Sequence, residues 1–261
     1  MTIFQCLEKA VSFIKKDIIF LGPFLVFTLL NSVVSRFVFH DIEKIITLRW
    51  FFILISQHTV QTLVGFFVIM MVLNFKKDEV YIPLIISLYL KRFKVFVGAS
   101  LLINIPFSLL VFFGASLAQG AEGASSMLII LFLVSGIYLM VPFTAFTYFV
   151  AIRVCSIRQP VVSVFKEMGF FCLKQYRLCL KWFWVMISLN FLQVFILPLS
   201  GTNFILKDVI LAVIQAIVLT VTMIFSVMYY QSDIAPHFRK RSNMNEALLP
   251  IQDDEIEGND S

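Results

Sequence analysis

The chain has 261 residues, of which 60% are hydrophobic and 14% charged, and its formal net charge is +5. A soluble domain typically has about 25% charged residues, so this composition excludes a soluble globule and indicates an integral membrane protein. The basic excess fits loops held on the cytoplasmic side of a membrane better than it fits nucleic acid, and we expect no nucleic-acid partner.

The chain begins with an amphipathic segment over residues 2–16, in which apolar side chains recur at helical spacing among polar ones. Residues 18–39 and 50–75 follow as two apolar stretches, each long enough to cross a bilayer as a helix. A short charged segment separates these stretches, and Trp50 stands where an interfacial aromatic residue belongs. This first unit is therefore one surface helix followed by two spans.

The same order returns twice along the chain. Residues 80–94 and 159–181 are amphipathic with a basic stripe, and each segment leads directly into a pair of apolar stretches. We therefore predict an all-α integral membrane protein with six transmembrane helices and three interfacial amphipathic helices in a threefold helix-span-span pattern. The remaining four spans are predicted at residues 95–118, 127–152, 182–199 and 207–230.

The sequence divides into a membrane domain and a tail. Residues 1–241 form one polytopic membrane domain in this interpretation. Residues 242–261 are polar and acidic, with Asp253, Asp254 and Glu255 in succession and few large apolar side chains. Such a segment cannot bury enough apolar surface to order itself, so we predict a disordered cytoplasmic tail.

Basic residues predict the orientation of the spans. If both termini are cytoplasmic, nearly all of the 21 Lys and Arg residues fall in segments on that side. Loops rich in Lys and Arg stay in the cytoplasm, so we predict cytoplasmic N- and C-termini. The exceptions are Arg36, Lys44, Arg49 and Lys207.

Polar residues cluster within the second predicted span. Gln57 and Gln61 share one helical face, while His58 and Thr62 form the neighbouring row. They either line a substrate path, with His58 as its titratable member, or form hydrogen bonds between helices. Both interpretations stay open at this point. The full candidate intramembrane patch comprises Gln57, His58, Gln61, Thr62, Asn104, Asn190, Gln193 and Gln215.

Basic side chains on the second and third amphipathic segments form a second candidate site. Helices of this kind either bind anionic headgroups or a cytoplasmic partner, or only anchor and orient the bundle. Membrane lipids are the expected partners, together with another membrane or cytoplasmic protein. The candidate headgroup contacts are Lys91, Arg92, Lys94, Lys166, Lys174, Arg177 and Lys181.

The sequence carries no signature of enzymatic chemistry. None of the 16 Asp and Glu residues lies in the middle of a predicted span, where an ionisable group would need a functional reason. No zinc-protease, nucleophile-elbow or P-loop motif occurs. The histidines, His40, His58 and His237, are too scattered to predict a metal site. We expect no enzyme activity, no metal and no cofactor.

One stretch carries a family resemblance. Residues 148–167 read Tyr-Phe-Val-Ala-Ile-Arg-Val-Cys-Ser-Ile-Arg-Gln-Pro-Val-Val-Ser-Val-Phe-Lys-Glu, so a span ends in Arg153 and a Pro160 turn precedes an amphipathic helix. With its layout over about residues 1–235, the chain resembles a broad bacterial family of six-span membrane proteins. That family includes the membrane domain fused to some glycerophosphodiester phosphodiesterases. The resemblance implies a multi-pass protein of the bacterial inner membrane and supplies no catalytic residues.

Two functions from different classes follow from these observations. The first is a non-enzymatic role in envelope organisation or in assisting another membrane component. The alternative is a transporter of a small molecule or lipid, with a polar path along the second span. A transporter predicts a polar cavity between repeats, whereas an organising protein predicts a closed apolar bundle. A membrane enzyme, the third and least favoured class, predicts polar groups that converge just below the interface.

Overall fold

A computed structural model describes residues 2–39, 48–75, 80–120, 126–157, 159–196 and 204–239. Every regular element within these residues is helical, in agreement with the predicted all-α class. The expected acidic tail, residues 242–261, lies outside them.

Six of the helices in the described part of the chain are long. They are α2 (Gly22–Phe39), α3 (Leu48–Leu73), α5 (Phe93–Gly120), α6 (Ser126–Ser156), α8 (Tyr176–Ile196) and α9 (Phe204–Tyr229). Three shorter helices precede the three long pairs, namely α1 (Ile3–Lys16), α4 (Ile82–Lys91) and α7 (Val161–Lys174). A 3-10 turn, η1 (Ile18–Leu21), joins α1 to α2, and the π-helical η3 (Tyr230–Ile234) joins α9 to α10 (Ala235–Arg239).

The third short helix ends earlier than its sequence pattern predicts. Gln175, at φ −107° and ψ 44°, ends α7, and α8 begins one residue later at Tyr176. Arg177 and Lys181 therefore lie on the long helix α8 and not on the surface segment expected to run to residue 181. The amphipathic pattern continues through the turn because the first turns of α8 keep an exposed basic side.

Six membrane spans are only partly supported by the helices. Among the residues whose side chains are described, two segments are long and apolar enough to cross a membrane, Phe51–Leu73 and Asp208–Phe238. A third is added if Ile3–Lys16 and Ile18–Val34 count as one span bent by 104°. That bend places α1 nearly at a right angle to α2, which is the geometry of a surface helix that leads into a span.

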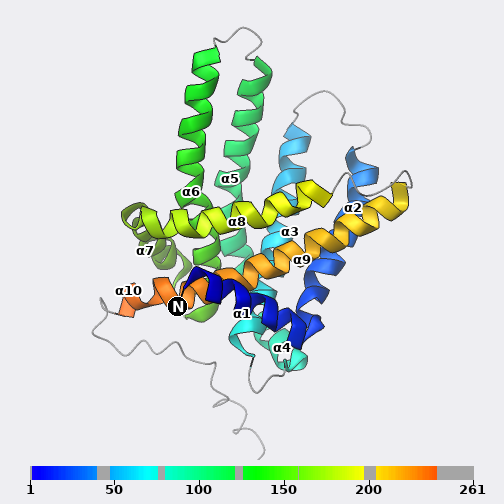
Figure 1. Ribbon diagram of the computed structural model, residues 1–261, viewed down its shortest axis with the longest axis vertical. Helices are drawn as coiled ribbons and strands as arrows, with labels where there is room; N and C mark the ends of the chain where they lie inside the picture. The colour runs from blue at the N-terminus through cyan, green and yellow to red at the C-terminus, as the bar shows by residue number, and fades with distance from the viewer. Residues whose placement is uncertain are drawn as a thin grey trace, which may run out of the picture.

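The three pairs of long helices contact one another in a closed ring. The second helix of each pair packs on the first helix of the next pair, so that α3 contacts α5, α6 contacts α8, and α9 contacts α2. The three second helices, α3, α6 and α9, also contact one another. They form the centre of the molecule, from which the helix pairs diverge (Figure 1).

Each short helix packs on the second helix of the preceding pair, with α1 on α9, α4 on α3 and α7 on α6. One side chain reinforces each contact. Tyr89 of α4 donates a hydrogen bond to the Leu63 carbonyl over 3.0 Å. The thiol of Cys6 lies 3.6 Å from the Ser232 hydroxyl. In α7, Glu167 forms the 2.8 Å ion pair with Arg153 of α6.

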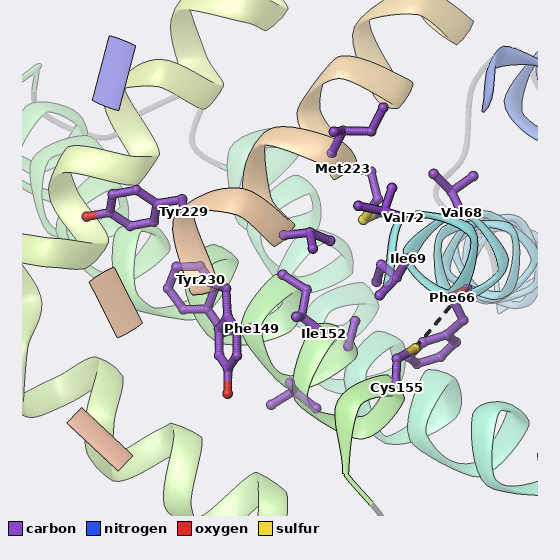
Figure 2. Close-up of a cluster of buried hydrophobic side chains, with 14 of the residues drawn as sticks. Phe66, Val68, Ile69, Val72, Phe149, Ile152, Cys155, Met223, Tyr229 and Tyr230 are labelled. Carbon is purple, nitrogen blue, oxygen red and sulfur yellow. Dashed lines mark hydrogen bonds between the residues drawn. The ribbon is translucent and has the colours of Figure 1, made fainter. Parts of the chain in front are cut away.

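The apolar core lies where α3, α6 and α9 meet at their C-terminal halves. Figure 2 shows side chains from all three helices in one cluster. Within it, the Cys155 thiol of α6 donates to the Phe66 carbonyl of α3 over 3.8 Å. Close van der Waals packing of these side chains holds the three helices together. Its fully buried members include Phe66, Ile69, Phe149, Ile152 and Tyr230.

Arg92 caps the C-terminal end of α6. Its guanidinium donates hydrogen bonds to the carbonyls of Cys155, Val154 and Ile157 over 3.1, 2.6 and 3.0 Å. The last carbonyls of a helix lack intrahelical partners and carry partial negative charge. An arginine there supplies both hydrogen-bond donors and a compensating positive charge. Arg92 thus joins the turn between α4 and α5 to α6.

Arg153 is the second inward-facing arginine at this end. Its side chain is only 8% exposed, and its guanidinium bonds to Glu167 at 2.8 Å and to the Tyr230 hydroxyl at 3.3 Å. The Phe238 ring covers it, with 4.2 Å between the guanidinium carbon and the ring centroid. Arg153 therefore joins α6, α7, η3 and α10.

The thiols provide a direct readout of folding. All four cysteines, Cys6, Cys155, Cys172 and Cys179, are buried and free. A hydrogen bond with Cys179, together with burial, raises the pKa of the Cys172 thiol, and burial raises the pKa of Cys6. Thiolates are the reactive form, so a thiol-reactive fluorophore should label the protein only as it unfolds.

Arg92→Gln should lower the free energy of unfolding by about 1–3 kcal/mol, because a hydrogen bond from a charged group to buried carbonyls contributes that much. The readout is the unfolding temperature of purified protein, followed with the thiol-reactive fluorophore. Lys91→Gln is the matched control, because Lys91 is adjacent and exposed. Equal unfolding temperatures for the two variants would contradict the capping role.

Candidate functional site

A cavity of about 330 Å³ lies between the helix pairs, and all six long helices contribute to its wall. Its floor is made by small and flexible residues next to the apolar core, among them Gly65, Ala151 and Met223. Other lining residues are Phe24, His58, Gln61, Thr62, Ile103, Asn104, Phe107, Thr144, Thr147, Tyr148, Trp182, Phe183, Met186, Ile187, Asn190 and Leu219.

A polar contact between α3 and α5 forms one side of the cavity. Asn104 is 5% exposed, and its amide nitrogen donates to the Thr62 hydroxyl at 2.9 Å and to the His58 carbonyl at 3.2 Å. Thr62 in turn donates to the same His58 carbonyl at 2.8 Å. The His58 ring meets Phe107 of α5 edge to face, with 5.2 Å between centroids. These contacts leave the carbonyl oxygen of Asn104 without a donor among the described residues.

Other polar groups on this side also lack a partner within the described part of the chain. The Gln61 amide and the Tyr148 hydroxyl both line the cavity, and neither makes a side-chain hydrogen bond there. The ring nitrogens of His58 likewise make none. These side chains are half-buried and line the cavity with polar atoms that have no partner among the described residues, so they are available to polar atoms of a ligand.

Two threonines on α6 add hydroxyl oxygens to the wall. Thr144 donates to the Met140 carbonyl at 2.7 Å, and Thr147 donates to the Thr144 carbonyl at 2.7 Å. Each hydroxyl proton is used within its own helix, as is usual for threonine in apolar helices, which leaves the oxygens as acceptors.

The opposite side of the cavity belongs to α8 and α9 and is apolar apart from Asn190 at the rim. Trp182 is fully buried, its indole nitrogen donates to the Ser226 hydroxyl at 3.0 Å, and its ring lies 5.0 Å from that of Tyr148. A Cβ added at Gly65 would lie 2.7 Å from the terminal methyl of Met223. The absence of a side chain at residue 65 therefore leaves room for the end of the Met223 side chain at the cavity floor.

The structure brings together five members of the intramembrane patch expected from the sequence. His58, Gln61, Thr62 and Asn104 share the α3–α5 wall, and Asn190 lies at the exposed rim, where it donates to the Met186 carbonyl at 2.8 Å. The other members are placed differently. Gln57 is half-buried and does not line the cavity, Gln215 is exposed on α9, and the side chain of Gln193 lies outside the described residues.

Sequence reasoning missed Thr144, Thr147, Tyr148 and Trp182. A hydroxyl-bearing row at residues 144, 147 and 148 on one face of α6 was the available signal. Threonine and tyrosine are common in apolar helices for other reasons, and only the packing of α6 against α8 and α3 places this face on the cavity.

The expected headgroup contacts separate into two groups. Arg92 points into the protein and caps α6. The others, Lys91, Lys94, Lys166, Lys174, Arg177 and Lys181, are exposed. Large apolar side chains stand beside them on α7, where Val162 and Leu173 are each 74% exposed. This mixture of exposed apolar and basic side chains is typical of a helix that lies at a membrane surface.

The described residues offer no group of three or more His, Cys, Asp or Glu that could hold a metal ion. The lining residues are uncharged apart from the titratable His58 and Tyr148. The arrangement can therefore bind through hydrogen bonds and apolar contact.

Comparison of the chain with protein-family models, curated proteins and solved structures finds no match. The resemblance to the six-span bacterial family stays a prediction.

Asn104→Leu should lower the free energy of unfolding by about 0.6–2 kcal/mol, because it removes the hydrogen bonds between α3 and α5. Asn190→Leu is the matched control, since Asn190 is exposed and bonds only within α8. Unfolding followed with the thiol-reactive fluorophore measures both variants. A loss of stability in Asn190→Leu as large as that in Asn104→Leu would refute the α3–α5 link.

Proposed function

We propose that this chain is a multi-pass plasma-membrane protein that binds a small molecule in its central cavity and carries it across the bilayer. No chemical change of the bound molecule is part of the proposal. One observation carries it. The cavity lies at the meeting point of three helix pairs and collects unpaired polar groups from different pairs.

The position of the cavity favours transport over an organising role. Transporters commonly bind their substrates between structural repeats near the middle of the membrane. Here the cyclic packing of three similar units creates such a place, and each unit contributes both of its long helices to the wall. A protein that only organises other components has no need of a polar cavity, and a closed apolar bundle would serve it better.

The proposed topology places all six long helices across the membrane. The C-terminal halves of α3, α6 and α9 then meet near the cytoplasmic face, where α1, α4 and α7 lie along the surface. Contact between Cys6 and Ser232 puts the N-terminal helix beside the end of the described chain, in accordance with both termini on one side (Figure 1). In this arrangement the cavity opens away from the cytoplasm, because the apolar core closes its other end.

Cysteine labelling in intact cells tests this orientation. The four native thiols are buried, so a membrane-impermeant maleimide should spare them. Ser125→Cys, in the loop predicted to be outside, should be labelled in intact cells. Lys174→Cys, on the exposed side of α7, should be labelled only after lysis. The reverse pattern would invert the topology.

Native mass spectrometry of the detergent-purified protein tests the binding function. Wild type should retain a discrete added mass, and Ala151→Leu should lose it, because the new side chain fills the cavity floor. Gly98→Leu is the matched control, since nothing lies within 4 Å of a Cβ added at that exposed position on α5.

The thermal unfolding assay shows whether each variant is folded, and Thr147→Leu replaces Ala151→Leu if the latter is not. A wild type without any retained mass, or a cavity-filled variant with undiminished occupancy, would overturn the proposed function.

A further inference from the structure

We infer that the ligand of the cavity is an uncharged alcohol with a single apolar chain or small ring body. Its hydroxyl group lies against α3, α5 and α6, and its body lies under α8 and α9. This inference rests on the proposed function and adds to it the class and orientation of the ligand.

The lack of charged side chains in the described lining of the cavity argues against an ionised ligand. Among the described lining residues there is no Lys, Arg, Asp or Glu. The arginines nearest the core have other partners, since Arg92 bonds to the end of α6 and Arg153 pairs with Glu167. A carboxylate or phosphate in this cavity would lose its hydration without gaining a counter-charge, which is costly within a bilayer.

The two sides of the cavity differ in polarity, and this difference orients a ligand. Most polar side chains come from α3, α5 and α6. Apart from Asn190 at the exposed rim, α8 and α9 contribute only apolar residues and Trp182, whose indole nitrogen is bonded to Ser226. An amphipathic molecule satisfies both walls only in one orientation. The flexible methionines can adapt to the shape of an apolar body.

The unpaired groups of the cavity wall match a ligand whose polar group both donates and accepts hydrogen bonds. The carbonyl oxygen of Asn104 needs a donor, because its amide nitrogen is already used by α3. The hydroxyl of Tyr148 is an available donor, and the Gln61 amide can do either. A hydroxyl group supplies one donor and accepting lone pairs, so it can serve these groups together, whereas a ketone or ester can only accept.

The volume limits the body of the ligand. The cavity has a volume of about 330 Å³. This is at the lower end of ordinary ligand pockets and suits one chain or a small ring system. A phospholipid with two acyl chains is too large to enter whole.

Photolabelling tests the class with two probes that share one chain. The first is a long-chain alcohol that carries a diazirine and an alkyne, and the second is the corresponding alkyl sulfate, which is permanently anionic. Full-length protein in nanodiscs of zwitterionic lipid is labelled, and the modified peptides are mapped. The alcohol should label lining residues of α8 and α9 saturably, and the sulfate should label only residues outside the cavity.

Variants of the unpaired groups test the orientation. Gln61→Leu and Tyr148→Phe should each weaken cavity labelling by the alcohol about fivefold, the effect of one hydrogen bond. Neither side chain bonds to the described residues, so the fold should be unaffected. Gln215→Leu and Tyr81→Phe are matched controls at exposed positions outside the cavity, and labelling should be unchanged.

The outcomes separate this inference from the proposed function. Cavity labelling by the sulfate at the same strength as the alcohol would overturn the neutral class. Unchanged labelling of Gln61→Leu and Tyr148→Phe would overturn the orientation. If wild type retains a discrete mass by native mass spectrometry and the alcohol does not label the cavity, only the alcohol class fails. If the wild type retains no mass by native mass spectrometry, the proposed function fails as well.

Discussion

The meeting of α3, α6 and α9 at their C-terminal halves is the contact on which the rest of the structure depends. These helices supply the central part of the buried core, and each of them also contacts one short helix and one first helix of the next pair. The core (Figure 2) closes one end of the molecule, and the cavity lies between the helix pairs on the other side of it. Cavity and core are therefore two consequences of a single packing arrangement.

Two arginines stabilise the closed end in different ways. Arg92 supplies hydrogen bonds to the unpaired carbonyls that end α6, whereas Arg153 pairs with Glu167 and lies under Phe238. Arg153 is buried and Arg92 is half-buried, and both have protein partners within bonding distance that offset the loss of hydration. The lysines of the same surface remain exposed beside apolar side chains. The basic residues at this end therefore have two roles. Arg92 and Arg153 form hydrogen bonds within the protein, whereas the lysines face outward.

The described lining of the cavity has no Lys, Arg, Asp or Glu side chain, and its apolar wall includes flexible methionines. A polar wall built from α3, α5 and α6 faces an apolar wall built from α8 and α9, and the two belong to different units of the cyclic arrangement. Movement of one pair relative to another would change the distance between these walls without breaking either. Trp182 connects the cavity to the core, because its ring contacts both Tyr148 of the cavity and Phe149 of the core. A shift of α8 relative to α6 would therefore change the packing of both.

The sequence by itself determined the helical class, the approximate places of the nine main helices within the described residues, and most of the residues from which a polar site could be made. Hydropathy and periodicity report these features because each helix must bury its own backbone and separate its apolar side from its polar side. Only the tertiary structure decided that Asn104 and Gln61 face the cavity while Gln215 faces outward, that Thr144, Thr147 and Tyr148 join them, and that Arg92 turns inward. Lipid tails are as apolar as a protein core, so an apolar helix carries no signal of which side meets a neighbouring helix. That choice is made by contacts between segments far apart in the chain.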